Sequence, residues 1–427
     1  MGLPSGSSSG GGPLHDRRSP SSPRAVWILT ACTALALIGD GTAYAVLPSA
    51  FSLVGITAAQ VGMLLSINRL VRPPLNILAG WLNSRVDPRG PYTLGLAIGA
   101  ASTLGYGLVR GFWPLLACRA LWGVAWALIA VSAYAMVLDA TATGNRGRYA
   151  GWYHSLSFCG GALGAMGGAW LADRLGFFPA MRMVGALSAG ALLLALRLPR
   201  RGAIPTPAQA PAGVPRARFS WRALRRMDGR LWLILSLNLI ERLLFAGVFY
   251  GTLGYALKQA LPDGLRWGAL AVGVATLTGA LLFARHGISV LSGPALGWVS
   301  DRLGDRTRML LLGELLGMAG LICLGLGRRP ALVVLAVVLT ALANGIVAPM
   351  LVAWLGDLTA RGGRGPLVGA YQTMGDIGSG LGPLLAYPLM DALGTGPVYL
   401  LCAGVLFFTL PAILWARRGW RPQGSAR

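Results

Sequence analysis

The second half of the sequence repeats a pattern of the first. Residues 144–164, GNRGRYAGWYHSLSFCGGALG, carry identical residues at eight positions of 362–382, GGRGPLVGAYQTMGDIGSGLG. Residues 80–85, GWLNSR, recur in a similar way at 297–302, GWVSDR. A chain whose halves share a pattern of this length is expected to fold into two similar units.

Long apolar runs fill both halves. Of the 427 residues, 55% are hydrophobic and only 12% are charged, so there is more apolar surface than one water-soluble core can bury. Runs of roughly 20 residues, the length that crosses a bilayer core of about 30 Å, recur along the chain. We predict twelve membrane spans, at residues 25–50, 58–81, 91–110, 112–138, 149–172, 177–198, 230–256, 267–298, 308–327, 331–355, 366–390 and 396–416. The expected fold is therefore an all-α membrane protein, with twelve transmembrane helices in two pseudo-symmetric six-helix bundles.

Polar stretches divide the chain around these spans. Residues 1–24 are rich in Gly, Ser and Pro and are predicted to form a disordered cytoplasmic tail ahead of a retained first helix. Residues 199–229 break the apolar rhythm with Pro, Ala and Arg, which indicates a cytoplasmic linker. The linker separates an N-terminal bundle, 25–198, from a C-terminal bundle, 230–416, and residues 417–427 are expected to form a second cytoplasmic tail.

The charge distribution indicates the orientation in the membrane. A formal charge of +23 could suggest a nucleic-acid partner. Most of the 37 Lys and Arg residues, however, fall in the tails and in the loops that face the cytoplasm if the N-terminus is inside. This asymmetry follows the positive-inside rule of membrane proteins. We therefore predict that both termini are cytoplasmic, and we expect no nucleic-acid partner.

The sequence carries no signature of enzymatic chemistry. It has no G-x-x-x-x-G-K-[ST] nucleotide-binding loop and no Ser/His/Asp or metal-ligand cluster. We therefore expect no enzymatic activity, no ATP hydrolysis, no cofactor and no metal. The five cysteines lie inside apolar segments, where they are expected to act as small packing residues.

Four short segments resemble motifs of the major facilitator superfamily. GWVSDRLGDR, residues 297–306, is similar to the family's loop between the second and third helices of a half. GWLNSRVDPR, residues 80–89, is its counterpart, with Ser84 where the family places an aspartate. RALWG, residues 119–123, resembles the fourth-helix motif, and GGALGAMGG, residues 160–168, resembles the fifth-helix motif of the antiporter branch.

The resemblance implies a multi-pass transporter of a bacterial plasma (inner) membrane, similar to the drug or metabolite:proton antiporters. It also implies a conformational gate at the two matching loops. The candidate gate residues there are Gly80, Arg85, Gly297, Asp301, Arg302, Gly304 and Arg306. Because Ser84 lacks the acid of the family's lock, we expect Asp301 to carry more of this role.

A stripe of small residues is the second candidate gate element. Gly160, Gly164 and Gly168 are four residues apart and therefore lie along one helix face, where backbones can approach closely. We expect tight static packing of a neighbouring helix at this face, and we interpret it in addition as a smooth surface on which the two bundles rock. Gly382 and Pro383 supply the Gly-Pro pair of the motif in the matching helix of the other half.

Two arginines lie where the membrane core is expected. Arg69 is 12 residues from Trp81 at the predicted inner boundary, about 18 Å along a helix, and Arg72 follows one turn later. Pro73 and Pro74 are expected to bend this helix and to leave carbonyl acceptors free. An arginine at this depth costs roughly 2.5–3.5 kcal/mol on insertion scales. Both side chains are therefore expected to meet water, an acid or an anionic ligand.

The repeat extends this polar centre to the second half, because Asn68 and Arg69 fall on Arg285 and His286. The candidate residues of the substrate and proton pathway are Asp40, Asn68, Arg69, Arg72, Arg119, Glu241, Arg242, Arg285, His286 and Asp376. The alternative is that these acids and arginines pair permanently within each bundle. Glu314, near the start of the ninth span, is expected to reach the inner surface.

Three functions remain open from the sequence. The first is a secondary active transporter that exports a small organic molecule in exchange for protons, with Asp40 as the proton-binding acid and, as the resemblance implies, Arg119 assisting. The second is an importer or exchanger of an organic anion, a phosphate ester or carboxylate, held by cavity arginines. The third is a membrane sensor that does not transport. The expected partners are a small-molecule substrate, protons and the lipid bilayer, and the expected state is a monomer.

Overall fold

The structure is a computed structural model that describes residues 23–141, 145–199, 229–267, 270–303, 305–327, 329–358 and 364–418. Most of the two predicted tails and of the predicted linker, residues 1–22, 200–228 and 419–427, lies outside the described residues, as does Gly304.

The N-terminal half contains α1 (Pro23–Ala50), α2 (Ala58–Leu70), α3 (Arg72–Asn83), α4 (Arg89–Tyr106), α5 (Phe112–Asp139), α6 (Arg146–Leu163), the π-helix η1 (Gly164–Gly168), α7 (Ala169–Leu175) and α8 (Phe177–Ala195). The C-terminal half contains α10 (Gly229–Glu241), the π-helix η2 (Arg242–Phe249), α11 (Tyr250–Ala260), strands β1 (Leu265–Trp267) and β2 (Leu270–Val272), α12 (Val274–Leu303), α13 (Arg306–Leu326), α14 (Pro330–Leu358), α15 (Arg364–Leu393) and α16 (Thr395–Arg418).

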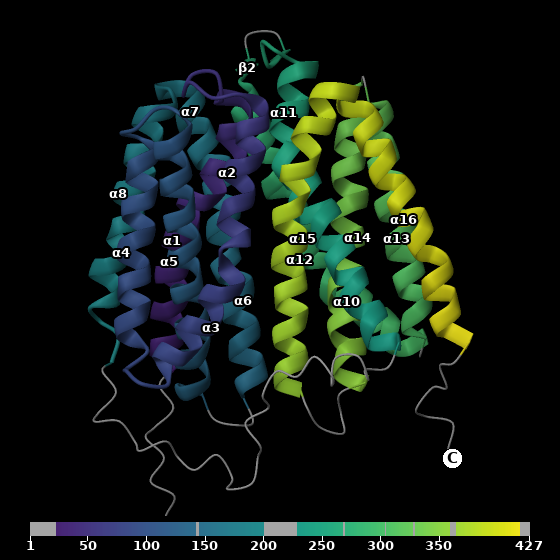
Figure 1. The fold of residues 1–427 in the computed structure, drawn as a ribbon, viewed down its shortest axis with the longest axis horizontal. Coiled ribbons are helices and arrows are strands. Elements are labelled where there is room, and N and C mark those ends of the chain that lie inside the picture. The colour runs from purple at the N-terminus through teal and green to yellow at the C-terminus, as the bar shows by residue number, and fades with distance from the viewer. Residues whose placement is uncertain are drawn as a thin grey trace, which may run out of the picture.

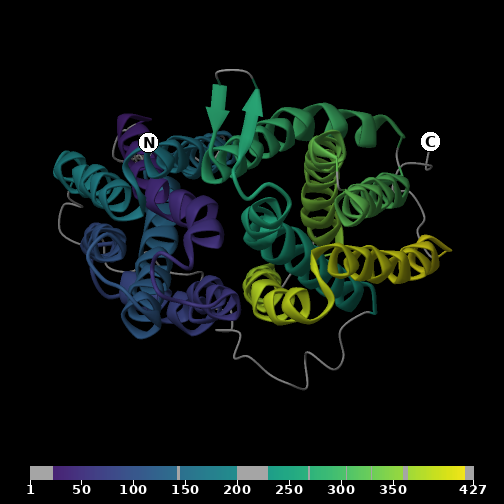
Figure 2. The same ribbon diagram turned by 90° about the horizontal axis from the view of Figure 1, so that it is seen from above.

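Each of the twelve predicted spans coincides with a helix or with consecutive helices, which confirms the predicted fold class. Figure 1 shows the two halves side by side, purple to blue and teal to yellow, and Figure 2 shows them from above as two groups of helices. Eight helices in the described part of the chain are long and apolar enough to cross a membrane by composition alone. The predicted span at 267–298 begins too early, because a short antiparallel hairpin of β1 and β2 precedes α12.

The second predicted span is broken where its prolines were expected to act. Helix α2 ends at Leu70 and α3 begins at Arg72, with Val71 between them. Pro73 and Pro74 occupy the first turn of α3. Proline is tolerated there because N–H groups of the first turn have no partner within the helix. The break separates the helix that carries Arg69 from the helix that carries Arg72.

The repeat is visible as repeated geometry. Gly176 and Gly394, which are equivalent positions of the two halves, both adopt positive φ angles, of 87° and 86°, immediately before α8 and α16. A side chain at either position would be strained in this conformation, which explains the glycine. The guanidinium of Arg302 stacks on the ring of Trp298, with its Cζ 3.7 Å from the ring centroid. Arg85, its counterpart in the other half, stacks on the ring of Trp81.

The bundles share one apolar core at one end only. This core gathers buried residues from both halves, including Leu47 and Val61 of the first and Leu253 and Tyr387 of the second, at the end where the hairpin lies, which we call the hairpin end. At the opposite end each bundle has its own core. The two bundles are therefore packed together at the hairpin end and, over the described residues, are not joined by a common core at the other.

Close backbone contacts bring the bundles together. Gly62 of α2 faces the carbonyl oxygen of Pro383 in α15, and a Cβ there would lie 2.7 Å from that oxygen. Gly279 of α12 meets the backbone of Ala165 in η1 in the same manner. Glycine at these positions allows helices of opposite bundles to touch.

One acid bridges the bundles at the hairpin end. The Oδ2 of Asp173 in α7 accepts hydrogen bonds from the backbone N–H of Thr276 at 2.7 Å and from its Oγ1 at 2.6 Å. Thr276 lies in the first turn of α12, whose N–H groups lack partners within the helix. A carboxylate at a helix N-terminus also interacts favourably with the helix dipole. Asp173 is therefore an acid of one bundle that caps a helix of the other.

We expect Asp173→Ala to favour separation of the bundles at the hairpin end, because the loss of such a cap costs about 1 kcal/mol, about a fivefold shift in population. The measurement is the distance between two spin labels, one in each bundle at that end. Asp391→Ala is the matched control, because Asp391 is the equivalent acid of the other half and accepts its bond from Tyr255 of its own bundle. If the two variants gave the same distribution of spin-label distances, this would contradict the role of Asp173 in holding the bundles together at the hairpin end.

Candidate functional site

The polar centre of the N-terminal bundle is built around an ion pair. The Nη1 of Arg119 in α5 lies 2.6 Å from the Oδ1 of Asp40 in α1, and Arg119 is only 1% exposed. The Arg119 guanidinium also lies over the ring of Tyr44, one turn along from Asp40, at 4.7 Å from the centroid. The Nε and Nη2 of Arg119 have no hydrogen-bond partner among the described residues. Among the described residues, Asp40 is thus the acid that neutralises the buried guanidinium of Arg119, and two nitrogens of that guanidinium remain available as donors.

The two arginines of the second span lie on either side of the helix break. The Nε of Arg69 donates to the Oη of Tyr44 at 3.4 Å, so Arg69 and Arg119 share one aromatic ring. Arg72 is 3% exposed and its Nη2 donates to the Oδ1 of Asn68 at 2.6 Å. Its guanidinium lies 5.5 Å from the ring of Trp126. The break therefore holds Arg69 against α1 and Arg72 against α5.

Asp376 of α15 connects this centre to the C-terminal bundle. Its Oδ1 lies 4.0 Å from the Nη1 of Arg72, and its Oδ2 accepts a hydrogen bond of 3.4 Å from the Nδ2 of Asn76. The alternative of pairing within each bundle therefore describes Arg119 with Asp40, but not Arg72, whose acid comes from the other bundle. A contact of this kind has to change if the two bundles move relative to each other.

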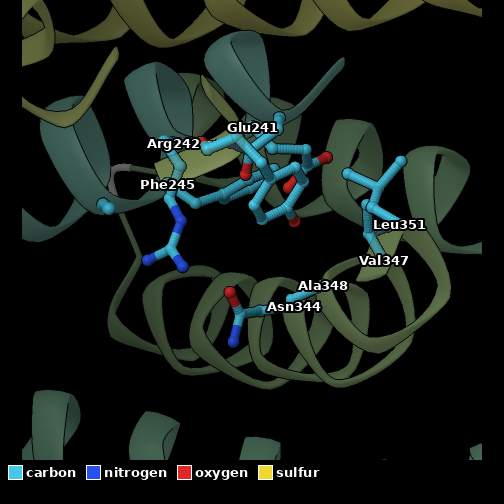
Figure 3. A pocket seen from close by; sticks show the side chains of 10 residues that line it. Glu241, Arg242, Phe245, Asn344, Val347, Ala348 and Leu351 are labelled. Atoms are coloured by element: carbon cyan, nitrogen blue, oxygen red, sulfur yellow. Dashed lines mark hydrogen bonds between the residues drawn. The ribbon is translucent and has the colours of Figure 1, made fainter. Parts of the chain in front are cut away.

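The C-terminal bundle holds a small, partly open hollow between α10, η2, α14 and α15, which we call the pocket (Figure 3). Glu241, Arg242 and Phe245 lie on one wall, and Asn344 and the aliphatic side chains of α14 lie on the facing wall. Arg242 is exposed although it lies within a predicted span, so it borders open space. Amide, charged and aromatic groups around a small hollow are typical of a site for a small polar molecule.

Arg285 and His286 of α12 do not line this pocket. Arg285 is 8% exposed, and its guanidinium lies 5.1 Å from the ring centroid of Phe249. Within the described ranges its Nε and Nη2 have no hydrogen-bond partner, and neither does the Nε2 of His286. In the predicted cationic pair of the second half, Arg285 is therefore buried and His286 half-buried, and both have unused hydrogen-bonding capacity.

The gate loops show which residues anchor the following helices. Asp305 caps α13, because its Oδ1 accepts from the backbone N–H of Thr307 at 3.0 Å and from that of Arg308 at 3.3 Å. Asp87 accepts from the N–H of Arg89 at 3.1 Å in the matching loop. This equivalence was not predicted from the sequence, because the alignment of GWLNSR with GWVSDR places Asp87 on a glycine. The lock role of Asp301 stays a prediction.

The glycine stripe packs differently from the prediction. A Cβ at Gly160 or Gly164 would collide with the backbone carbonyls of Ala34 or Ile38 in α1, and one at Gly168 with the side chain of Thr42. These three glycines therefore bring α6 and η1 against α1 of their own bundle, and the predicted sliding surface between bundles is not this face. The contact with the other bundle is made by Ala165, which meets Gly279 of α12.

Gly382 occupies the equivalent position in the C-terminal bundle. A Cβ there would lie 2.5 Å from the Cα of Gly247 in η2. This contact again lies within one bundle, between α15 and the helix that matches α1. Pro383, the next residue, contacts both bundles, because its ring faces Gly251 of α11 and its carbonyl oxygen faces Gly62 of α2. Within the predicted Gly-Pro pair, Pro383 is therefore the residue that reaches the other bundle.

Comparison with known proteins identifies the family. The family model described as Major Facilitator Superfamily matches residues 29–288 and 243–426, and the two matches together cover most of the chain. The chain belongs to the Major Facilitator Superfamily. Its members are transporters of small solutes and not enzymes. The comparison with curated proteins gives no match.

Solved structures of the Major Facilitator Superfamily share the fold at low sequence identity. A bacterial homologue of the human lysosomal transporter Spinster, in an inward-facing and unoccupied conformation, is 15% identical with a TM-score of 0.72, covering 94% of this chain and 96% of that one. The nucleoside transporter NupG is 14% identical with a TM-score of 0.67, covering 93% and 100%. The human organic anion transporter MFSD10 is 18% identical with a TM-score of 0.62, covering 92% and 99%. At these identities the likeness shows the fold alone.

Proposed function

We propose that this protein is a proton-coupled secondary transporter that exports a small organic molecule across the plasma membrane by alternating access. The observation that carries the proposal is the buried ion pair of Asp40 and Arg119. A proton that neutralises Asp40 removes the acid paired with Arg119. Breaking a buried pair by removing one partner costs about 3–5 kcal/mol. Proton binding at Asp40 is therefore expected to drive a rearrangement around Arg119.

The surroundings of the pair support a coupling role. Arg69 and Arg119 share the ring of Tyr44, and Arg72 reaches Asp376 in the other bundle. A guanidinium released from Asp40 can donate instead to the hydroxyl of Tyr44 or to Asp376, and Asp376 already contacts Arg72 across the bundle interface. The charge state of one acid would in this way bias the relative position of the bundles, which is what alternating access requires.

The pocket beside Glu241 and Arg242 is the proposed solute site. It lies away from the closed hairpin end, beside the separate core of the C-terminal bundle. With the positive-inside orientation, the end without a shared core faces the cytoplasm. The structure would then be inward-facing, so that a solute could enter the pocket from the cytoplasm before export. The protein is proposed to work as a monomer, with both termini in the cytoplasm.

The test uses everted membrane vesicles that contain the overexpressed protein and an imposed pH gradient reported by a fluorescent dye. A pool of lipophilic cations and a pool of organic anions are added in turn. Export in exchange for protons predicts that an effective pool dissipates the gradient in these vesicles, and not in vesicles without the protein. A gradient unaffected by any pool that the protein is shown to transport would contradict proton coupling.

A second candidate is a transporter of an organic anion, such as a phosphate ester or a carboxylate. The observation that favours it is the pair of nitrogens on the buried Arg285 that have no partner in the described part of the chain. A guanidinium can bind a carboxylate or phosphate through two parallel hydrogen bonds. In this case Arg285, which is buried outside the pocket in this structure, would become accessible as the bundles move and then hold the solute. Arg69 and Arg72 would set the positive potential of the site.

Arg285→Ala distinguishes the two candidates. If Arg285 holds an anion, its removal should cost about 2–5 kcal/mol, an affinity loss of about 30-fold or more. The measurement is the binding of radiolabelled glycerol 3-phosphate and citrate to the purified protein. Arg110→Ala is the matched control, because Arg110 also stacks on a phenylalanine, Phe178, but lies in a loop outside the helices. Unchanged anion binding in Arg285→Ala would exclude Arg285 as the anion ligand.

A further inference from the structure

Glu314 occupies an unexpected position. The sequence suggested a residue that reaches the inner surface, but in the structure Glu314 is 1% exposed in the interior of the C-terminal bundle. It lies on α13, eight residues after the helix begins, or about 12 Å along its axis. Neither of its carboxylate oxygens has a hydrogen-bond partner among the residues that the structure describes. An ionised carboxylate in this setting would be strongly disfavoured.

A second buried acid is its neighbour. Phe245, one turn after Glu241, packs against Gly317 of α13, one turn after Glu314, since a Cβ at Gly317 would lie 2.7 Å from the Phe245 ring. This packing sets the carboxyl group of Glu241 next to that of Glu314. Glu241 is 8% exposed and its Oε1 also lacks a partner in the described chain. The hydroxyl of Thr409 in α16 is the other polar neighbour of Glu314, and it donates to the carbonyl oxygen of Leu406. Glu241 lines the pocket, whereas Glu314 lies behind it, so the pair has one member at the pocket wall and one in the core.

Two cations interact with the Glu241 end of the pair. Arg242, the next residue along the chain, and Arg285 of α12 both interact electrostatically with Glu241. Tyr371 of α15 is a further titratable neighbour of Glu241. Arg285 is more than nine-tenths buried and retains two nitrogens without a partner in the described ranges. Both guanidiniums therefore lie within electrostatic reach of Glu241.

Two adjacent buried carboxyl groups do not both ionise, because like charges at short range in a region of low dielectric repel strongly. One proton shared between them removes the repulsion and supplies a donor to an oxygen that lacks one. We propose that Glu241 and Glu314 form a second proton-binding site, in the C-terminal bundle, that holds one shared proton while the structure is in this state. The proton comes from water in the pocket and returns to it, with no other bond made or broken.

The position of the site suggests how it responds to the solute. A cationic solute in the pocket, or a closer approach of Arg242 or Arg285 to Glu241, would stabilise the ionised form of the pair and release the shared proton. An anionic solute that engages Arg285 would have the opposite effect. This coupling to solute rests on the proposed transport function, whereas the shared proton itself does not.

The test is infrared spectroscopy of the purified protein in lipid nanodiscs at neutral pH, where the C=O stretch of a protonated carboxylic acid is separate from the carboxylate bands. We expect the unmodified protein to show a protonated-carboxyl band that disappears in E314Q. In E241Q the band should persist and change frequency, because Glu314 loses its carboxyl neighbour. Size-exclusion profiles and thermal unfolding of both variants establish that they fold.

Asp40→Asn and Asp391→Asn are the controls, and both should leave this band unchanged. A band that is absent from the unmodified protein, or present and identical in E314Q, would overturn the proposal. A band that is lost in E314Q but unaffected in E241Q would contradict the claim that the two carboxyl groups share one proton. Failure of Asp40→Asn to uncouple transport would contradict the proposed function and leave this result standing, so the two proposals fail separately.

Discussion

Replacing Asp40 with asparagine is expected to abolish uphill transport of the solute while leaving downhill exchange intact. Asparagine keeps the shape and one oxygen acceptor for the Nη1 of Arg119, and it mimics neutral Asp40, a form through which the proposed cycle itself passes. It cannot exchange a proton with water, so the ion pair can no longer be made and broken by pH. Solute accumulation against a gradient in proteoliposomes should therefore fall to the equilibrium value, with counterflow of labelled solute persisting.

The control for Asp40→Asn is Asp263→Asn, which alters an exposed acid in the turn before the hairpin. It should retain uphill transport at the level of the unmodified protein. An Asp40→Asn protein that still concentrates solute in response to a pH gradient would contradict the role of Asp40. Loss of both uphill transport and counterflow would indicate instead that Asp40 is needed for solute binding or folding.

The second large effect is expected at Gly164. A Cβ added there would collide with the carbonyl oxygen of Ile38, which is backbone and cannot rotate away. Overpacking of a close contact typically costs about 1–3 kcal/mol, and we expect Gly164→Ala to lie at or above the upper end. The measurement is thermal unfolding of the purified protein in detergent, where Gly164→Ala should show a clearly lowered midpoint.

Gly167→Ala provides the matched comparison. It lies three residues away in the same π-helix, but a Cβ there meets nothing within 4 Å. Alanine favours helix by up to about 1 kcal/mol over glycine, so this variant should be neutral or stabilised. Similar midpoints for the two variants would show that the stripe does not hold η1 against α1.

The fold was predictable because its signals are local in the sequence. Apolar length indicated the twelve spans, the repeat indicated their grouping, and Pro73 and Pro74 marked the break after Leu70. Depth along a helix was also accessible, because each residue adds about 1.5 Å. Arg69 and Arg72 were placed in a polar centre on this basis, and Arg119 through the resemblance of RALWG to the fourth-helix motif. The structure brings all three together around Tyr44, Asp40 and Asp376.

Partners across helices were much harder to predict, because depth does not define the direction in which a side chain points. Glu314 was expected at the surface, and its burial beside Glu241 depends on how α13 packs. The glycine stripe was recognised, but its partner is α1 and not the other bundle. Asp173 carries no signal that would link it to Thr276, 103 residues away. Such contacts become visible only when the rotation of each helix is known.

The most direct test of proton coupling is proton exchange by the purified protein on solute binding. The solute pool that dissipates the gradient in vesicles is added to protein in weakly buffered detergent solution, and the pH change is recorded for the unmodified protein and for Asp40→Asn. We predict a solute-dependent proton exchange that is clearly reduced in Asp40→Asn. Equal proton exchange by the two proteins, or none by the unmodified protein, would contradict the claim that Asp40 couples protons to transport.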